Sequence, residues 1–182
     1  MKKGKLIIVS GPSGSGKSTV TKIVKDRLNI PLSVSATTRK PRAGEINGKD
    51  YYFLTEEEFK EKIKNDEFYE YANVHGNYYG TLKETVQENL DKGLDVILEI
   101  DVQGALIAKE KKKDAVLVFF KAKDMKVLEE RLRKRETDSE EVIKIRLENA
   151  LKELEYENRY DCTIINENIE DSCQELIDII NG

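Results

Sequence analysis

Residues 11–18 read GPSGSGKS, and they stand between the apolar run LIIV at residues 6–9 and a stretch of helical character at residues 19–28. The pattern predicts a buried strand, then a tight turn rich in glycine, then a helix. In such a turn, successive backbone N–H groups converge at the N-terminal end of the helix, where they can bind an anion. This order of elements, with the spacing GxxxxGKS, predicts a loop that binds the phosphates of a nucleotide.

Two side chains of this loop are expected to carry most of its chemistry. Lys17 is expected to reach the β- and γ-phosphates of a nucleoside triphosphate, and the Ser18 hydroxyl is expected to bind an accompanying Mg²⁺ ion. A glycine-rich turn without a ligand is the alternative, and the complete motif argues against it. The residues expected to hold the nucleotide are Gly11, Ser13, Gly14, Ser15, Gly16, Lys17, Ser18 and Thr19.

The composition limits the class of protein. Of the 182 residues, 38% are hydrophobic and 36% are charged, which suits one hydrophobic core with small appended subdomains. No run of residues approaches the roughly 20 apolar residues of a membrane span, so we expect no membrane partner. The net charge of −4 argues against broad nucleic-acid binding, for which a basic domain is usual.

The location of the protein is predicted from its first residues and its cysteines. The first apolar run begins almost at once, so we expect no signal peptide. Cys162 and Cys173 form neither a metal nor a disulfide pattern, and we expect free thiols in a reducing cytoplasm. The sequence does not predict an oligomeric state.

The apolar runs predict an α/β fold. The runs at residues 6–9, 96–98 and 116–120 are apolar throughout, as in parallel strands that are buried on both faces. We therefore predict a P-loop three-layer α/β fold with a central parallel sheet. The segments with strand character are residues 5–10, 32–35, 51–54, 68–74, 95–100, 116–121 and 163–165.

Two segments differ from this core in composition. Residues 36–80 are richer in tyrosine and turn residues, and they predict a smaller mixed α/β subdomain inserted after the first helix. Residues 125–156 are mostly charged with a helical period, and they predict a mobile helical lid. Capping-box patterns at residues 55–58 and 138–141 predict helix starts. We expect a single domain, whose core comprises residues 1–35, 81–124 and 157–182.

Two acidic residues follow a buried run in the sequence LEIDVQG at residues 98–104. Glu99 and Asp101 are two residues apart, so their side chains are expected on one face of the strand end. Buried carboxylates are costly unless they meet cations or hydrogen-bond donors, and a structural ion pair is one way to satisfy them. We favour a site that organises Mg²⁺, with Asp101 as a metal-binding residue beside Ser18.

Asp101 to Gly104 also matches the DxxG motif of small GTPases. Proteins of that class carry an Asn-Lys-x-Asp motif near a later strand end. The nearest segment here, KAKD at residues 121–124, lacks the asparagine, and the separation between Lys17 and Asp101 is long for that class. We therefore do not predict a GTPase.

A second anion site is indicated by SATTRKPRAGE at residues 35–45. Arg39 and Arg42 are three residues apart in a loop that a proline and a glycine constrain, so their planar guanidinium groups can bind one phosphate from two directions. Tyr51 could add a hydroxyl donor. Surface salt bridges are the alternative for these arginines. Because this loop lies outside the phosphate loop, it predicts a second, anionic substrate.

The segment EYANVHGNYYGT at residues 70–81 contains a candidate pocket for a base. Glu70 stands among tyrosines, where a carboxylate can accept hydrogen bonds from the two N–H groups of a guanine edge, and Thr81 could meet the guanine O6 atom. Buried polar pairing of this kind discriminates strongly between bases. A tyrosine-rich hairpin core explains the same residues equally well.

Arginines gather in the predicted lid, in RLRKR at residues 131–135 and again at Arg146. Phosphoryl transfer needs positive charge around the migrating group after water has been excluded, and a closing helical lid supplies both. Most arginines on such helices only solvate a face, so each one alone is a weak indication.

Taken together, these segments resemble the guanylate kinase family from about residue 5 to residue 180. The resemblance implies ATP-dependent phosphorylation of GMP, with dGMP as a second substrate, by direct in-line phosphoryl transfer. It also implies that the inserted subdomain binds GMP. The motifs that carry the resemblance are GPSGSGKS, SATTRKPRAGEINGKDYYF, FYEYA with GNYYGT, LEIDVQG, RLRKRETDSEEVIKIRL and the late TIIN.

The resemblance also implies a role for each matching position. Around the transferring phosphoryl group it places the catalytic residues Lys17, Arg39, Arg135 and Arg146. Beside the adenine of ATP it places Arg131 and Asn166. Around the GMP phosphate it places Ser35, Arg39, Arg42, Tyr51 and Tyr79, with Glu45 supporting their loop. Around the guanine it places Glu70 and Thr81, with Glu99 and Asp101 near the base or the metal.

The sequence departs from the family pattern at one acidic position. Glu99 stands where many relatives have aspartate, which leaves open whether its carboxylate touches substrate directly. Thr81 replaces a serine and keeps the hydroxyl. A kinase for another nucleoside monophosphate remains an alternative, as does a non-catalytic interaction module of guanylate-kinase type. Such modules typically have a degraded phosphate loop, whereas the loop here is intact.

Overall fold

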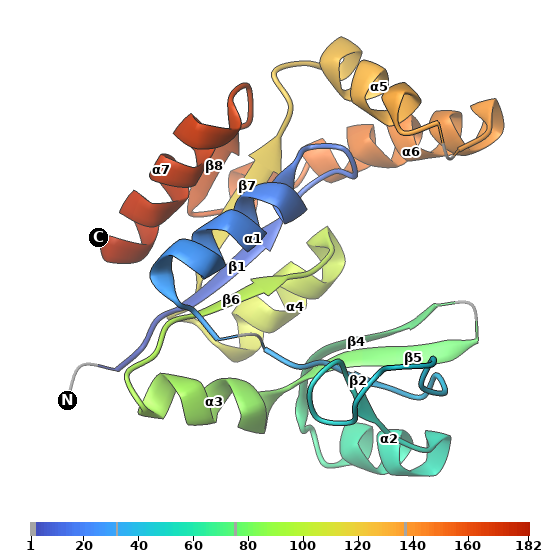
Figure 1. The fold of residues 1–182 in the computed structure, drawn as a ribbon, viewed down its shortest axis with the longest axis vertical. Coiled ribbons are helices and arrows are strands. Elements are labelled where there is room, and N and C mark those ends of the chain that lie inside the picture. Colours follow the sequence, from blue (N-terminus) through green and yellow to red (C-terminus); the bar gives the residue numbers. More distant parts are fainter. Residues whose placement is uncertain (1–2, 32, 75, 137) are drawn as a thin grey trace.

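The computed structural model describes residues 3–31, 33–74, 76–136 and 138–182, and it is organised around two sheets. Figure 1 shows a larger sheet with helices on both sides, a smaller sheet at one end of the molecule and a pair of helices at the other end. Within the described residues, no helix is long and apolar enough to cross a membrane.

The larger sheet has the strand order β6-β1-β7-β8, and all of its pairings are parallel. β1 is an inner strand, because Ile8 lies opposite Leu98 on one side and Leu117 on the other. Every residue of β1 is buried, which explains the absence of polar alternation in its sequence. The strands are β1 (Leu6–Ser10), β6 (Val96–Glu99), β7 (Val116–Lys121) and β8 (Cys162–Ile165).

Helices cover both faces of this sheet. The face that includes Ile7 and Val9 packs against α1 (Lys17–Leu28) and α7 (Ile169–Asn181). The opposite face, which includes Ile8, packs against α3 (Lys83–Asp91) and α4 (Val102–Lys111). The predicted three-layer α/β fold with a central parallel sheet is therefore confirmed.

The smaller sheet has a hydrophobic core of its own. Its strand order is β3-β2-β5-β4, and α2 (Glu56–Lys64) begins at the predicted capping box of Thr55 and Glu58. Phe59 of α2 is fully buried and stacks on Phe68 and Tyr78, with ring centroids 4.4 and 5.2 Å apart. The strands are β2 (Ala36–Thr37), β3 (Tyr52–Phe53), β4 (Phe68–Val74) and β5 (Asn77–Leu82).

The helical pair is formed by α5 (Met125–Lys134) and α6 (Glu140–Leu154). Leu128 and Leu132 of α5 pack with Ala150 of α6 in a small separate cluster. A short 3₁₀ helix (Glu157–Arg159) follows and leads the chain back into β8. We use the word lid for α5, α6 and the turn between them.

Three element predictions are corrected by the structure. No strand forms at residues 33–35, and residue 32 lies outside the described residues; pairing begins at Ala36, where β3 and β5 flank β2. β5 is absent from the predicted strands, because its polar and glycine residues hide the alternation. α6 has Ser139 as its N-cap, since the Asp138 carboxylate pairs with Arg146 instead.

The Phe59 side chain offers a test of the separate core of the smaller sheet. Phe59→Ala is expected to lower the free energy of unfolding by about 3–5 kcal/mol, because it removes a fully buried ring that has two stacking partners. Urea unfolding followed by circular dichroism measures the change. Ile46→Ala, at a side chain that is 55% exposed, should change it by less than about 0.5 kcal/mol. Equal effects of the two variants would contradict this description.

Candidate active site

The glycine-rich loop joins the end of β1 to the start of α1, as predicted, and glycine is sterically required at two of its positions. Gly11 has φ +142°, and a Cβ built on it would lie 2.0 Å from the Phe120 carbonyl oxygen. Gly16 has φ +82°, and its Cβ would lie 2.1 Å from Nδ2 of Asn166. The loop is therefore packed against β7 and the segment after β8, with no room for side chains at these positions.

Lys17 and Ser15 provide polar groups at this loop. Nζ of Lys17 donates a hydrogen bond to the Pro12 carbonyl oxygen at 3.3 Å. Burial lowers the pKa of Lys17, while the charges of Glu99 and Glu153 act in the opposite direction. The Ser15 hydroxyl is buried and has no hydrogen-bond partner among the described residues.

The two predicted acidic residues have different surroundings. The Ser18 hydroxyl donates a hydrogen bond to Oε1 of Glu99, the last residue of β6. Asp101 lies beyond the strand as the N-cap of α4, where Oδ1 accepts from the Gly104 N–H at 2.9 Å. The expectation that both side chains share one strand face is wrong, because β6 ends before Asp101. Glu99 is therefore the carboxylate that contacts Ser18.

Ser18 and Glu99 offer two oxygen donors of the kind that Mg²⁺ prefers. Among the described residues, no group of three or more histidine, cysteine or acidic side chains could hold a metal ion. A divalent ion that enters with a nucleotide needs only one or two protein oxygens, because phosphates and water complete its octahedral shell. The donor set fits such an ion.

The predicted second anion site is centred on Arg39. Its Nη1 and Nη2 donate to the two carboxylate oxygens of Glu45 at 3.0 and 2.9 Å. Its guanidinium carbon lies 5.5 Å from the ring centroid of Tyr51 and 5.8 Å from that of Phe53. Glu45 also accepts from the Arg42 backbone N–H at 2.6 Å. Hydrogen bonds from Arg39 and then from Arg42 lower the pKa of Glu45 to about 2.

The other predicted residues of this site lie near Arg39 and differ in their solvent exposure. The ring of Tyr79 meets that of Tyr51 edge to face, with centroids 6.1 Å apart. Ser35 is half-buried, and its carbonyl oxygen accepts from the Tyr52 N–H at 2.9 Å. The side chain of Arg42 is exposed, which leaves its charge available to a ligand. Arg39, held by Glu45, thus forms the rigid part of the site.

Glu70 and Thr81 form the predicted polar pair across β4 and β5. Thr81 Oγ1 donates to Glu70 Oε1 at 2.7 Å, and a register shift between Phe68 and Glu70 marks a bulge that changes the direction of the side chain. A Cβ built on Gly104 would lie 2.7 Å from Asp101 Oδ1 and 3.2 Å from Glu70 Oε2. The carboxylates of Glu70 and Asp101 therefore meet at the first turn of α4. Burial raises the pKa of Glu70, and the charge of Asp101 raises it further. The hydrogen bond from Thr81 acts in the opposite direction.

Two lid arginines contact the phosphate loop directly. Arg146 donates from Nη1 to the Ser13 hydroxyl at 2.8 Å, and its Nε lies 3.2 Å from the Asp138 carboxylate. Arg131 donates from Nη1 to the Ser15 carbonyl oxygen at 3.5 Å and from Nη2 to the Asn166 carbonyl oxygen at 2.6 Å. Arg135 is the C-cap residue of α5. Burial lowers the pKa of Lys17, and the charge of Arg135 acts in the same direction. The lid therefore brings three arginines to one loop.

A pocket of about 310 Å³ opens beside this loop. Asn166, which is 3% exposed, forms a buried part of the pocket lining, whereas the arginine side chains supply positive charge to the pocket. The residues that line the pocket are Gly14, Gly16, Thr19, Arg131, Arg135, Asn166, Glu167 and Ile169.

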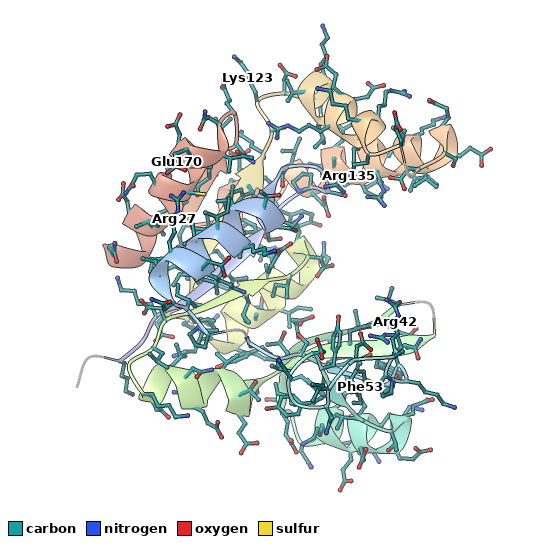
Figure 2. The ribbon with its side chains drawn as sticks, in the orientation of Figure 1. Arg27, Arg42, Phe53, Lys123, Arg135 and Glu170 are labelled. Atoms are coloured by element: carbon teal, nitrogen blue, oxygen red, sulfur yellow. The ribbon has the colours of Figure 1, made fainter. Side chains whose placement is uncertain are left out.

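The predicted residues therefore form two groups in different parts of the molecule. One group surrounds the phosphate loop, and the other lies on the smaller sheet and the start of α4. Figure 2 shows Arg135 on the lid and Arg42 on the smaller sheet, with a gap between these two parts of the ribbon. Sequence reasoning missed Asp138, Glu153, Gly104 and Phe53 as neighbours of the site. Nothing in their local patterns distinguishes them from ordinary capping, surface or core residues.

Comparison with known proteins assigns the chain to a family. The family model described as guanylate kinase matches residues 3–182. The chain belongs to the guanylate kinase family. A guanylate kinase from Fusobacterium nucleatum is 62% identical over 182 residues, which cover 100% of this chain and 98% of the relative. The crystal structure of guanylate kinase from Anaplasma phagocytophilum has a TM-score of 0.73 and 36% identity, and the match covers 100% of this chain and 86% of that chain.

A guanylate kinase from Clostridium tetani is also similar, with 49% identity over 100% of this chain and 88% of the relative. These matches confirm the predicted family and the predicted reaction, ATP-dependent phosphorylation of GMP. A kinase for another nucleoside monophosphate and a non-catalytic module are not favoured.

The ion pair of Arg39 and Glu45 predicts a pH-dependent contribution to stability. Because the folded pKa of Glu45 lies at about 2, below its ordinary value of 4.5, the pair stabilises the fold above pH 4.5. This contribution disappears as the pH falls from 4.5 towards 2. Glu45→Gln should therefore be less stable than the wild type at pH 6, and the difference in melting temperature should shrink towards pH 2.

Glu175→Gln is the control for this measurement, because Glu175 is exposed on α7, far along the chain from this loop. The difference in melting temperature between Glu175→Gln and the wild type should not shrink in this way as the pH falls. A Glu45→Gln difference that stays constant from pH 6 to pH 2 would contradict the assigned ion pair.

Proposed function

We propose that the two groups of residues divide the reaction into a donor site and an acceptor site. At the donor site, residues 11–19 bind the phosphates of ATP, and the pocket next to Arg131 receives the adenine. The contacts of Arg131 and Arg146 with this loop, and the position of Arg135 in the lining of the adjoining pocket, support this assignment. At the acceptor site, the smaller sheet binds GMP.

Mg²⁺ is proposed to enter the donor site with ATP. Ser18 would hold it directly, and Glu99 would organise it through the Ser18 hydroxyl or a bound water. The bound ion would neutralise charge on the β- and γ-phosphates. Asp101, first expected to be a metal-binding residue, is better placed beside Glu70, because both carboxylates approach Gly104.

At the acceptor site, Arg39 and Arg42 would bind the GMP phosphate, together with the hydroxyl groups of Ser35, Tyr51 and Tyr79. Glu70 would accept from the N–H groups of guanine, and Thr81 would serve the O6 atom. The Glu70–Thr81 hydrogen bond at 2.7 Å supports a shared base pocket. Since these contacts are with phosphate and base, dGMP is expected to be a second substrate.

Transfer itself would rest on positioning and charge. The GMP phosphate attacks the γ-phosphoryl group in line, and Lys17, Arg39, Arg135 and Arg146 surround the negative charge in the transition state. Arg42 and Arg135 lie on opposite sides of the open space in Figure 2. We therefore propose that residues 36–80 and the lid, about 125–156, close on the core of residues 1–35, 81–124 and 157–182. Free cysteines and these substrates favour a cytoplasmic location.

The proposal is tested by ADP release from Mg·ATP with GMP, dGMP, AMP, UMP, CMP and dTMP offered separately. GMP and dGMP should be phosphorylated, and the other monophosphates should give little or no ADP. The same panel tests the base pocket in Glu70→Gln, because the amide replaces one of the two acceptor oxygens with an NH₂ donor. We expect kcat/KM for GMP to fall by roughly 10- to 100-fold, with an unchanged KM for ATP.

Glu57→Gln, in the exposed first turn of α2, is the matched control for Glu70→Gln. It should retain wild-type kinetics with every substrate. An unchanged base preference in Glu70→Gln would remove Glu70 from the guanine site, and strong wild-type activity with another base would remove the guanine pocket altogether.

Lys17→Met is expected to abolish turnover and leave the fold intact, because it removes the charge that stabilises the transferring phosphoryl group. The steady-state rate and the circular dichroism spectrum are the measurements. Lys22→Met, on an exposed position of the same helix, should keep normal activity. Activity of Lys17→Met similar to the wild type would refute the donor site.

A further inference from the structure

Asn166, the residue after β8, has a side chain whose hydrogen bonds are all made within the protein fold. The residue is 3% exposed. Its Nδ2 donates to the carbonyl oxygen of Ser15 at 2.9 Å, and its Oδ1 accepts from the hydroxyl of Ser172 at 3.0 Å. Ser172 lies in the first turn of α7 and is 1% exposed. The amide is therefore held at both ends, and its donor reaches the phosphate loop.

These contacts do not suit direct recognition of a base by the Asn166 amide. We propose instead that Asn166 is a positioning residue that holds the phosphate loop in its binding conformation, and that Ser172 fixes the orientation of the Asn166 amide. The inference rests on the proposed binding of ATP phosphates by this loop.

The planarity of the peptide bond explains how such a contact would act. In a trans peptide, the carbonyl of Ser15 and the N–H of Gly16 point in opposite directions. A donor fixed on the Ser15 carbonyl therefore turns the Gly16 N–H to the side of the loop away from Asn166. A phosphate-binding loop needs its N–H groups turned inward and its carbonyls turned outward. Asn166 satisfies one carbonyl on the outer side.

The fit around this contact is tight, and the lid takes part in it. A Cβ on Gly16 would lie 2.1 Å from Nδ2 of Asn166, so the amide packs directly against the loop backbone. Arg131 of α5 donates to the backbone carbonyl of Asn166 at 2.6 Å, and its Nη1 lies 3.5 Å from the Ser15 carbonyl oxygen, farther than the 2.9 Å of Asn166 Nδ2. The loop, the segment after β8 and the lid therefore meet at one residue.

Binding of a triphosphate without a base separates this role from recognition of adenine. We would measure binding of Mg·tripolyphosphate, Mg·ATP and GMP to the wild type and to Asn166→Leu by isothermal titration calorimetry. Loss of a buried hydrogen bond is expected to weaken both Mg·tripolyphosphate and Mg·ATP by about tenfold, with GMP binding unchanged. Weaker Mg·ATP binding with unchanged tripolyphosphate binding would overturn the inference, as would unchanged binding of both.

Ser172→Ala supplies a second variant that needs little repacking. It removes only the hydroxyl that orients the amide, so tripolyphosphate and ATP should both bind about fivefold more weakly. If Asn166→Leu does not fold, this variant decides the question alone, and unchanged binding would overturn the inference. Asn168→Asp is the matched control, because Asp also accepts from the N–H groups of Glu170 and Asp171; it should bind all three ligands normally.

The wild-type measurements separate failure of this inference from failure of the proposed function. Absence of Mg·ATP binding would contradict the donor site itself. Binding of Mg·ATP without any binding of Mg·tripolyphosphate would contradict the inference alone, because a loop that the protein holds in shape binds phosphates without a base.

Discussion

The close packing of the phosphate loop against the ends of the central strands is the constraint on which the rest of this structure depends. At Gly11 a side chain would collide with the backbone of β7, and at Gly16 it would collide with Asn166. The loop can therefore keep its shape only while β1, β7 and the segment after β8 remain in register. The buried parallel sheet serves this purpose, since its register places three strand ends beside one another.

Around that fixed loop, the molecule distributes positive charge over separate units. The lid arginines reach the loop from one side, while Arg39 is held by Glu45 and two aromatic rings on the smaller sheet. The smaller sheet and the lid each have their own hydrophobic cluster. Each unit can therefore present its charges as one body. This arrangement suits the joining of two anionic substrates, which repel one another until cations surround them.

The local patterns of the sequence identified most elements, and they predicted a chemistry for both candidate sites. GPSGSGKS predicted the loop between β1 and α1, and residues 68–74 and 116–121 are strands with the predicted bounds. The paired arginines at 39 and 42 predicted an anion site on the inserted subdomain. In the structure, both arginines contact Glu45 in one polar cluster there. Failures occurred where the outcome depends on a distant partner. Asp101 caps a helix, and Asp138 pairs with an arginine from the middle of α6.

The sequence by itself determined the class of fold and the family, because these depend on short patterns of glycine, charge and apolar runs. Only the tertiary structure decided which groups meet. Glu99 rather than Asp101 contacts Ser18. The carboxylates of Glu70 and Asp101 both approach Gly104. The side chain of Asn166 donates a hydrogen bond to Ser15, which lies 151 positions away in the chain. These contacts depend on packing between strands and helices that are remote in sequence, and no local pattern encodes such distances.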